Sequence, residues 1–150
     1  MQELFILNGP NLNLLGAREP EIYGHSSLAD VEQWCAARCL AAGMKLVFRQ
    51  SNHEGALIDS IHEAMRLQQQ GLMAGLIINA GAYTHSSVAL HDALKALNCP
   101  KIELHISNTF AREAFRHHSY ISPAVDAVIA GLGVAGYALA VDAITEKMTR

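Results

Sequence analysis

The chain has 150 residues, of which 51% are hydrophobic and 17% are charged, and its net charge is -3 with neutral histidines. This length and apolar content fit a single domain over residues 1–150 with a substantial core. The weak negative charge and the lack of a basic cluster exclude nucleic acid as an expected partner. The low charged fraction indicates that part of the surface is buried against other copies of the chain.

The pattern of apolar residues also argues against a membrane partner. The first residues have no basic region before a long apolar run, so they do not resemble a signal peptide. The most apolar stretch, from Asp126 to Asp142, is too short to span a bilayer and is interrupted by glycines. Three cysteines without CxxC spacing predict buried, reduced thiols and a cytoplasmic protein. These cysteines are Cys35, Cys39 and Cys99.

Strands are predicted to alternate with helices along the whole chain. Ser27-Leu28-Ala29-Asp30 resembles a capping box that begins the first long helix, and Gly43 is a helix stop. Alternation of this kind implies crossover connections, so we expect an α/β fold with a flavodoxin-like, doubly wound, five-stranded parallel sheet and helices on both faces. In chain order, the elements are a strand at residues 4–7, a helix at 27–43, a strand at 44–49, a helix at 57–71, a strand at 76–78, a helix at 87–97, strands at 102–106 and 127–130, and a final helix.

Polar side chains follow four of the predicted strands at the points where the strands end. Ligands bind beyond these carboxyl ends in open parallel sheets. Turn chemistry explains such residues about as well at any one strand end, but four ends together favour a small-molecule site. The segments are Asn8-Gly9-Pro10-Asn11, Ser51-Asn52-His53-Glu54-Gly55, the group Asn79, Gly81, Thr84 and His85, and His105-Ile106-Ser107-Asn108.

Two loops add charged residues to the same edge of the predicted sheet. Residues 16–24 form a glycine-bounded segment that contains Arg18 and Tyr23 and is typical of a mobile lid. Arg112 and Arg116 follow the fourth strand. Arginines beside a cleft favour an anionic substrate, most simply a carboxylate. The alternative interpretation is that they are solvated surface charges.

Motifs for cofactors and metals are weak in this sequence. Residues 131–136 match GxGxxG, but no strand with a terminal acidic residue follows, so close helix–strand packing explains the glycines better. The sequence has no Walker A motif, no nucleophile elbow and no histidine spacing suited to a metal. Lysine is absent from the carboxyl edge, which disfavours Schiff-base chemistry. Acid–base chemistry by tyrosine, histidine, arginine and asparagine side chains remains, without a cofactor.

Longer segments of the chain resemble one enzyme family, the type II 3-dehydroquinate dehydratases. The resemblance covers nearly the whole chain in order. It implies a lyase that removes water from 3-dehydroquinate to give 3-dehydroshikimate through an enolate, with no metal or cofactor, in the shikimate pathway or in quinate breakdown. The matching segments are residues 8–24, 51–55, 78–87 and 103–108, and Arg112-Glu113-Ala114-Phe115-Arg116 with Ser119.

The resemblance also implies a catalytic role for four residues. Tyr23 would be the base that takes the C2 proton, and His105 the acid that protonates the leaving hydroxyl. A free tyrosine, with a pKa of about 10, is a poor base at neutral pH. Arg18 and Arg112 would therefore stabilise its anion and the transition state. Histidine suits the role of proton donor because its ordinary pKa lies near the working pH.

Further residues receive roles from the resemblance alone. Asn11 would help to hold the enolate, and Glu103 would orient His105. Asp92 would reach the site of a neighbouring subunit, since the family assembles as a homododecamer built as a tetramer of trimers. The other residues expected to bind substrate are Asn79, Gly81, His85, Ile106, Ser107 and Arg116.

A second function stays open on the residues themselves. The chain could be a non-catalytic module of the flavodoxin-like or receiver class that binds a small ligand. A receiver needs acidic residues after the first and third strands, where this chain has Asn8, Asn11 and Asn79 instead. Turnover without any added cofactor separates the enzyme from the binding module.

Overall fold

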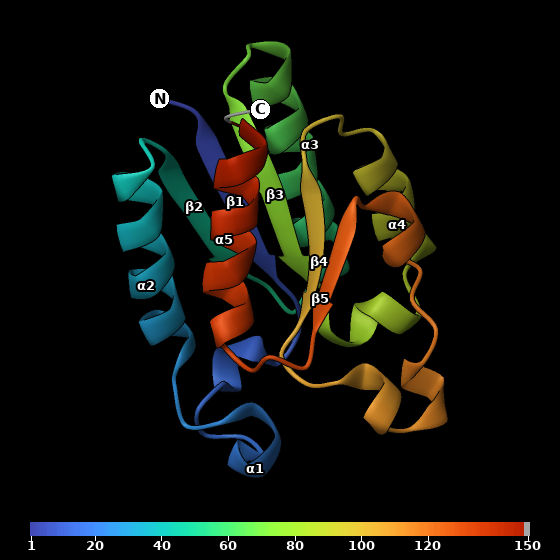
Figure 1. The fold of residues 1–150 in the computed structure, drawn as a ribbon. Coiled ribbons are helices and arrows are strands. Elements are labelled where there is room, and N and C mark those ends of the chain that lie inside the picture. Colours follow the sequence, from blue (N-terminus) through green and yellow to red (C-terminus); the bar gives the residue numbers. More distant parts are fainter. Residues whose placement is uncertain (149–150) are drawn as a thin grey trace.

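Five parallel strands form one sheet in the order β2-β1-β3-β4-β5 in the computed structural model, which describes residues 1–148 (Figure 1). This is the flavodoxin-like order, and the direction of winding reverses between β1 and β3. The prediction of a doubly wound, five-stranded parallel sheet is therefore confirmed. The strands are β1 (Glu3–Asn8), β2 (Lys45–Gln50), β3 (Met73–Asn79), β4 (Lys101–His105) and β5 (Ala127–Ala130).

Helices cover both faces of the sheet. α2 (Leu28–Ala41) and α5 (Ala135–Met148) lie on one face, and α3 (Glu54–Gln69) and α4 (Val88–Lys95) lie on the other (Figure 1). The short helix α1 (Pro20–Tyr23) lies beyond the carboxyl ends of the strands, at the lower end of the view. No helix in the described part of the chain is long and apolar enough to cross a membrane.

The two faces have separate apolar cores because side chains alternate along each strand. On β1, Leu4 and Ile6 belong to the cluster under α2 and α5, whereas Phe5 and Leu7 belong to the cluster under α3 and α4. All four of these side chains are buried. A central strand that is buried on both faces holds its carboxyl end firmly, and the site is built at that end.

Short sequence patterns predicted the start of α2 correctly, but not the start of β3. The predicted capping box is present, since Ser27 Oγ accepts the Asp30 N–H at 3.1 Å and the Asp30 carboxylate accepts the Ser27 N–H at 3.0 Å. β3 begins at Met73, three residues before the predicted strand. Gly75 weakens the apolar pattern there, and a Cβ at this position would lie 2.8 Å from Ile144 Cδ1 of α5.

The three glycines of the GxGxxG match have two different structural reasons. Gly136 packs closely, because a Cβ there would lie 3.0 Å from Leu104 Cδ1. Gly131 and Gly133 have φ values of 88° and 64°, so the turn before α5 requires them. The packing interpretation therefore holds for Gly136. It contributes at Gly131, where a Cβ would lie 3.2 Å from Asn108 Cβ, and it is wrong for Gly133, where no atom lies within 4 Å.

We expect the native thiols to be inert to alkylating reagents. Cys35, Cys39 and Cys99 are all buried, as predicted. Burial raises the pKa of Cys35 to about 12 and those of Cys39 and Cys99 to about 11. The reactive thiolate is therefore scarce near neutral pH. Thiol titration should give no reaction in buffer and three reacting thiols in denaturant. Rapid labelling of the native protein would contradict this.

Candidate active site

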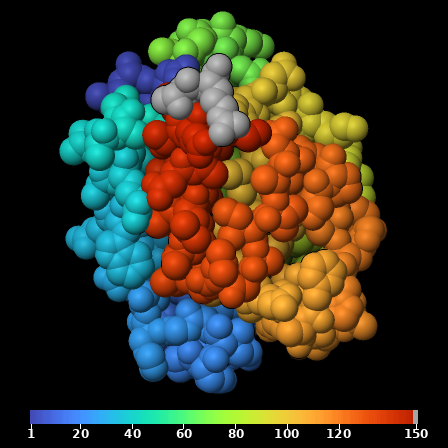
Figure 2. Space-filling model, viewed as in Figure 1, coloured from blue at the N-terminus to red at the C-terminus, as the bar shows by residue number. Residues whose placement is uncertain are grey.

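A solvent-open cleft lies at the carboxyl edge of the sheet, where the strand order reverses. Its empty volume, which includes space open to solvent, is about 710 Å³. Figure 2 shows the lid segment and the segment after β4 projecting from this same end of the molecule. Eleven of the thirteen predicted site residues lie in the cleft wall: Asn11, Arg18, Tyr23, Asn79, Gly81, His85, His105, Ile106, Ser107, Arg112 and Arg116.

The other two predicted residues lie outside this wall. Glu103 is buried on β4 beneath His105 and contacts the site through that histidine. Asp92 is exposed on α4, away from the cleft of its own chain. Its assignment to a neighbouring subunit's site stays a prediction.

Two guanidinium groups flank the phenol of Tyr23. Arg112 Nη1 donates to Tyr23 Oη at 2.7 Å, and the Arg112 Cζ lies 5.5 Å from the ring centroid. The Arg18 Cζ lies 5.6 Å from the same centroid. The Arg112 side chain is 15% exposed, whereas that of Arg18 is 42% exposed and also contacts Glu19 at 3.5 Å. Arg112 is thus the less exposed of the two guanidinium groups and the one that hydrogen-bonds to the phenol oxygen.

The lid that carries Arg18 and Tyr23 is shaped by unusual backbone conformations. Glu19, which precedes α1, has φ of 43°, and Gly16 and Gly24 have φ of 93° and 81°. Glycine adopts this region without strain, while glutamate does so at a cost. This turn directs the Tyr23 side chain toward the segment after β4. Motion of the lid stays a prediction.

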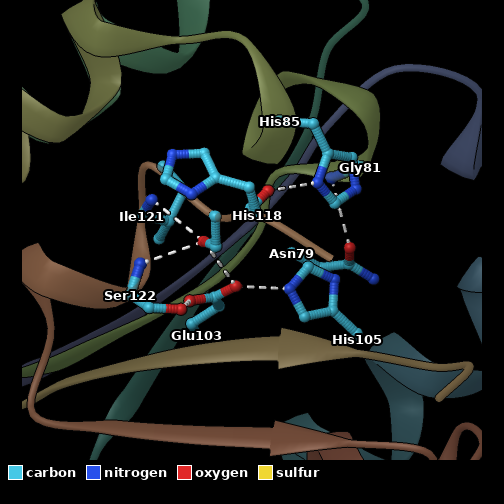
Figure 3. A network of polar contacts seen from close by, with 9 residues as sticks. Asn79, Gly81, His85, Glu103, His105, His118, Ile121 and Ser122 are labelled. Atoms are coloured by element: carbon cyan, nitrogen blue, oxygen red, sulfur yellow. Dashed lines mark hydrogen bonds and ion pairs between the residues drawn. The ribbon is translucent and has the colours of Figure 1, made fainter. Parts of the chain in front are cut away.

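His105 ends β4 and pairs with a buried carboxylate. Its Nε2 lies 2.5 Å from Glu103 Oε2 (Figure 3). Burial by itself would raise the pKa of Glu103, but hydrogen bonds from His105, Ser122 and Ser119 outweigh it and hold that pKa below its usual value. Glu103 is therefore ionised, and Nε2 of His105 carries a hydrogen.

His85 lies beside His105 in the cleft wall. The two rings are stacked, with centroids 6.5 Å apart and an interplanar angle of 18°. His85 Nδ1 lies 2.8 Å from the carbonyl oxygen of His118 and so donates to it. Burial lowers the pKa of His85, assisted by charge on His105 and Arg116. The lowered pKa favours the neutral form of His85, in which Nδ1 carries the hydrogen and Nε2 is an acceptor.

A buried tyrosine ties together the ends of the two central strands. Tyr137 of α5 donates to Asn8 Oδ1 at 2.6 Å and accepts from Asn79 Nδ2 at 2.9 Å. Asn79 Oδ1 in turn accepts the Gly81 N–H at 3.3 Å. These contacts fix the floor of the cleft where β1 and β3 meet. Asn11 lines the cleft with a left-handed φ of 68°, and its N–H donates to Asn52 Oδ1 at 3.0 Å.

Sequence reasoning missed several residues that shape the site. Tyr137 is 58 residues from Asn79, and no local pattern indicates their contact. Ser119 was noted within a motif without a role, and Ser122 was not noted. The apolar wall was also missed, although the spacing of its leucines after β1 could have indicated it. That wall contains Leu12, Leu14 and Leu15.

The Glu103 carboxylate should make folding stability depend on acid pH. Because its folded-state pKa is lowered, it stabilises the fold above its ordinary pKa, about 4.3, and this is lost as the pH falls through the lowered value. Glu103→Gln should lower the unfolding free energy at neutral pH by about 1–3 kcal/mol and flatten its dependence on acid pH. Urea unfolding at a series of pH values measures both, with exposed Glu32→Gln as the control. Equal pH dependence in the two variants would contradict the assignment.

The fold and the cleft together define a class: a flavodoxin-like α/β protein with an acid–base site made of side chains. An arginine-paired phenol and a carboxylate-paired imidazole line the same cleft. No group of three His, Cys, Asp or Glu side chains within residues 1–148 is arranged to hold a metal ion.

Comparison with known proteins identifies the family. The family model for dehydroquinase class II matches residues 2–145. The 3-dehydroquinate dehydratase of Acidovorax ebreus (strain TPSY) is 62% identical over 143 residues, which are 95% of this chain and 97% of that protein. The 3-dehydroquinate dehydratase of Variovorax paradoxus (strain S110) is 60% identical over 144 residues, 96% and 99% of the two chains. The chain belongs to the class II dehydroquinase family.

Solved structures agree with this membership. The type II dehydroquinase from Butyrivibrio crossotus DSM 2876 superposes with a TM-score of 0.90 at 42% identity, covering 95% of this chain and 97% of that one. The type II dehydroquinase from Propionibacterium acnes also has a TM-score of 0.90, at 39% identity and 97% coverage of both chains. The family resemblance inferred from the sequence motifs is therefore confirmed.

Proposed function

We propose that this chain is a lyase that dehydrates 3-dehydroquinate to 3-dehydroshikimate with its own side chains, as a single catalytic domain over residues 1–150. Membership of the class II dehydroquinase family supports the reaction. The observation that carries the mechanism is the 2.7 Å hydrogen bond from Arg112 to the Tyr23 hydroxyl, in the cleft that also contains His105.

The first step is removal of the C2 proton by the Tyr23 phenolate. The C2–H bond breaks, and its electron pair moves to the carbonyl oxygen to form an enolate. Tyr23 is suited to this step because Arg112 donates to its oxygen and Arg18 lies near its ring. The enolate needs donors placed in advance. Asn11 and the backbone amides at the strand ends supply them, directly or through water.

The second step is loss of the hydroxyl group next to C2. The enolate electrons return to form the carbon–carbon double bond, the C–O bond breaks, and His105 donates a proton so that water leaves. Glu103 supports this role because its carboxylate holds the imidazolium at Nε2. Nδ1 then delivers the proton on the cleft side. Protons exchanged with solvent restore Tyr23 and His105, and no metal or cofactor takes part.

Substrate binding uses the rest of the cleft wall. The carboxylate of the substrate suits the cationic rim formed by the arginines. Asn79, Gly81, His85, Ile106, Ser107 and Arg116 complete the binding surface.

Association of several copies of the chain would bring one residue of a neighbouring subunit to each cleft. We propose a homododecamer, a tetramer of trimers in the cytoplasm, in which Asp92 of one subunit reaches a neighbour's site. The exposed Val128 and Phe110 side chains support subunit contacts. A light-scattering mass near that of one chain would contradict this assembly.

An absorbance assay tests the reaction directly. Protein stripped of metal should convert 3-dehydroquinate with a rise in ultraviolet absorbance as the conjugated enone carboxylate forms. The assay also separates the two functions considered from the residues, because a binding module would retain the ligand without turnover. No absorbance change with a well-folded protein would refute the proposed activity.

A further inference from the structure

The Glu103 carboxyl accepts hydrogen bonds from His105 in the cleft wall and from two serines outside the substrate cleft. Its side chain is 2% exposed. Oε2 accepts from His105 Nε2 at 2.5 Å and from Ser119 Oγ at 3.0 Å, while Oε1 accepts from Ser122 Oγ (Figure 3). Within residues 1–148, no lysine or arginine forms an ion pair with this carboxyl. The negative charge of the carboxylate is therefore stabilised by hydrogen bonds from two hydroxyls and one imidazole.

The direction of the Ser119 hydrogen bond is fixed by the backbone. The N–H groups of Ile121 and Ser122 both donate to Ser119 Oγ at 3.0 Å. A hydroxyl has two acceptor lone pairs and one hydrogen. Because the amides occupy the lone pairs, the hydrogen is directed to Glu103 Oε2. A hydrogen bond donated to Oε2 favours the ionised form of the carboxyl over the neutral form.

The segment that carries the two serines is held in place. Ile121 is fully buried in the core beside α4. The Tyr120 N–H donates to the carbonyl of Thr84 at 2.9 Å, and the Tyr120 carbonyl accepts from His91 Nδ1 at 2.7 Å. η5 (Ser122–Ala124) then packs against α4. The two hydroxyls thus have little freedom to turn away from Glu103.

Neither serine touches the substrate cleft. Ser119 and Ser122 line a second cavity behind His105, which Glu103 and Thr84 also line. The two cavities share His85, His105, Thr109 and Arg116, but neither serine is part of the cleft wall. Loss of either hydroxyl should therefore leave the substrate contacts in place.

The protonation of His105 follows from this arrangement. An ionised Glu103 requires a hydrogen on Nε2 of His105, since a carboxylate only accepts. In the described part of the chain Nδ1 has no partner, so it is the nitrogen that gains and loses a proton. Without the two hydroxyls, a buried carboxyl would favour its neutral form. It would then take the shared proton and leave a neutral imidazole, which is a weaker acid.

We propose that Ser119 and Ser122 are positioning residues that keep the proton of the Glu103–His105 pair on the imidazole. This rests on the proposed function, in which His105 is the acid. Other titratable or charged groups around the pair are His85, Arg116, His117 and His118. The serine variants keep all four of these groups. A change in the protonation of the Glu103–His105 pair in the variants would therefore result from the loss of the hydroxyls.

Kinetics and infrared spectroscopy test the proposal. Each charge-assisted hydrogen bond corresponds to about a tenfold effect. Ser119→Ala and Ser122→Ala should each lower kcat about tenfold, and the double variant about a hundredfold, with KM unchanged. Isotope-edited infrared spectra near neutral pH should show a protonated carboxyl in the double variant that disappears when Glu103→Gln is added. Ser122→Thr keeps a hydroxyl and should restore kcat.

Controls separate this proposal from the proposed function. Ser60→Ala removes a buried hydroxyl that accepts from Arg49 at 3.1 Å, far from the cleft, and should leave kcat unchanged. If wild-type protein turns over and His105→Asn does not, an unchanged kcat in Ser122→Ala or an ionised Glu103 in the double variant overturns the serine roles. A rise in KM instead of a fall in kcat also overturns them. If wild-type protein has no activity, the proposed function fails, while the infrared spectra still report where the proton resides.

Discussion

Tyr23→Phe is expected to lower kcat by roughly 10²–10⁴-fold or to abolish turnover, because it removes the general base. Phenylalanine keeps the ring between Arg18 and Arg112 and loses only the oxygen that Arg112 contacts at 2.7 Å. The fold should be unchanged, since Tyr23 packs against the core under α2 and α5 through its ring, which phenylalanine keeps. Initial rates and the urea unfolding midpoint measure the two effects.

A matched tyrosine variant serves as the control for Tyr23→Phe. Tyr120 is also half-buried, its side-chain hydroxyl has no hydrogen-bond partner within residues 1–148, and it does not line the cleft. Tyr120→Phe should keep full turnover. Unchanged turnover in Tyr23→Phe would refute the assignment of the base.

Arg112→Met is expected to lower kcat by roughly 10²–10³-fold, the usual cost of removing one preorganised donor to a developing or resident negative charge. Arg112 acts on the phenol oxygen directly and is largely shielded from solvent. Lysine keeps the charge but lacks the planar fork, so Arg112→Lys should recover part of the rate. Arg38→Met is the control, because Arg38 pairs with Asp142 on the surface at 2.9 Å.

The two variants should not be additive. If Arg112 acts mainly by stabilising the Tyr23 phenolate, then it has little to do once the phenol oxygen is absent. The double variant should therefore be hardly slower than Tyr23→Phe alone. Fully multiplicative losses would show that Arg112 acts on the substrate independently, through its position beside Ser107 at 3.4 Å.

Local patterns predicted the elements and the membership of the site. Capping at Ser27 and apolar runs act over a few residues, so sequence alone determines them. The carboxyl ends of parallel strands meet at one edge, and this explains why eleven of thirteen expected residues line one cleft. The positive φ of Gly131 and Gly133 was not predicted, because a positive φ leaves no distinct mark in a glycine pattern.

The tertiary structure alone decided which of these residues act in pairs. The contact between Arg112 and Tyr23 spans 89 residues, and that between Tyr137 and Asn8 spans 129. Ser119 lies in the loop before η5 and Ser122 lies in η5, and the hydroxyls of both donate hydrogen bonds to Glu103 on β4. Such pairings depend on how helices and loops pack over the sheet edge, and no spacing along the chain encodes that geometry. The sequence by itself therefore determined which acidic, basic and hydrogen-bonding groups are available at the site. Packing determined which of these groups are paired by hydrogen bonds.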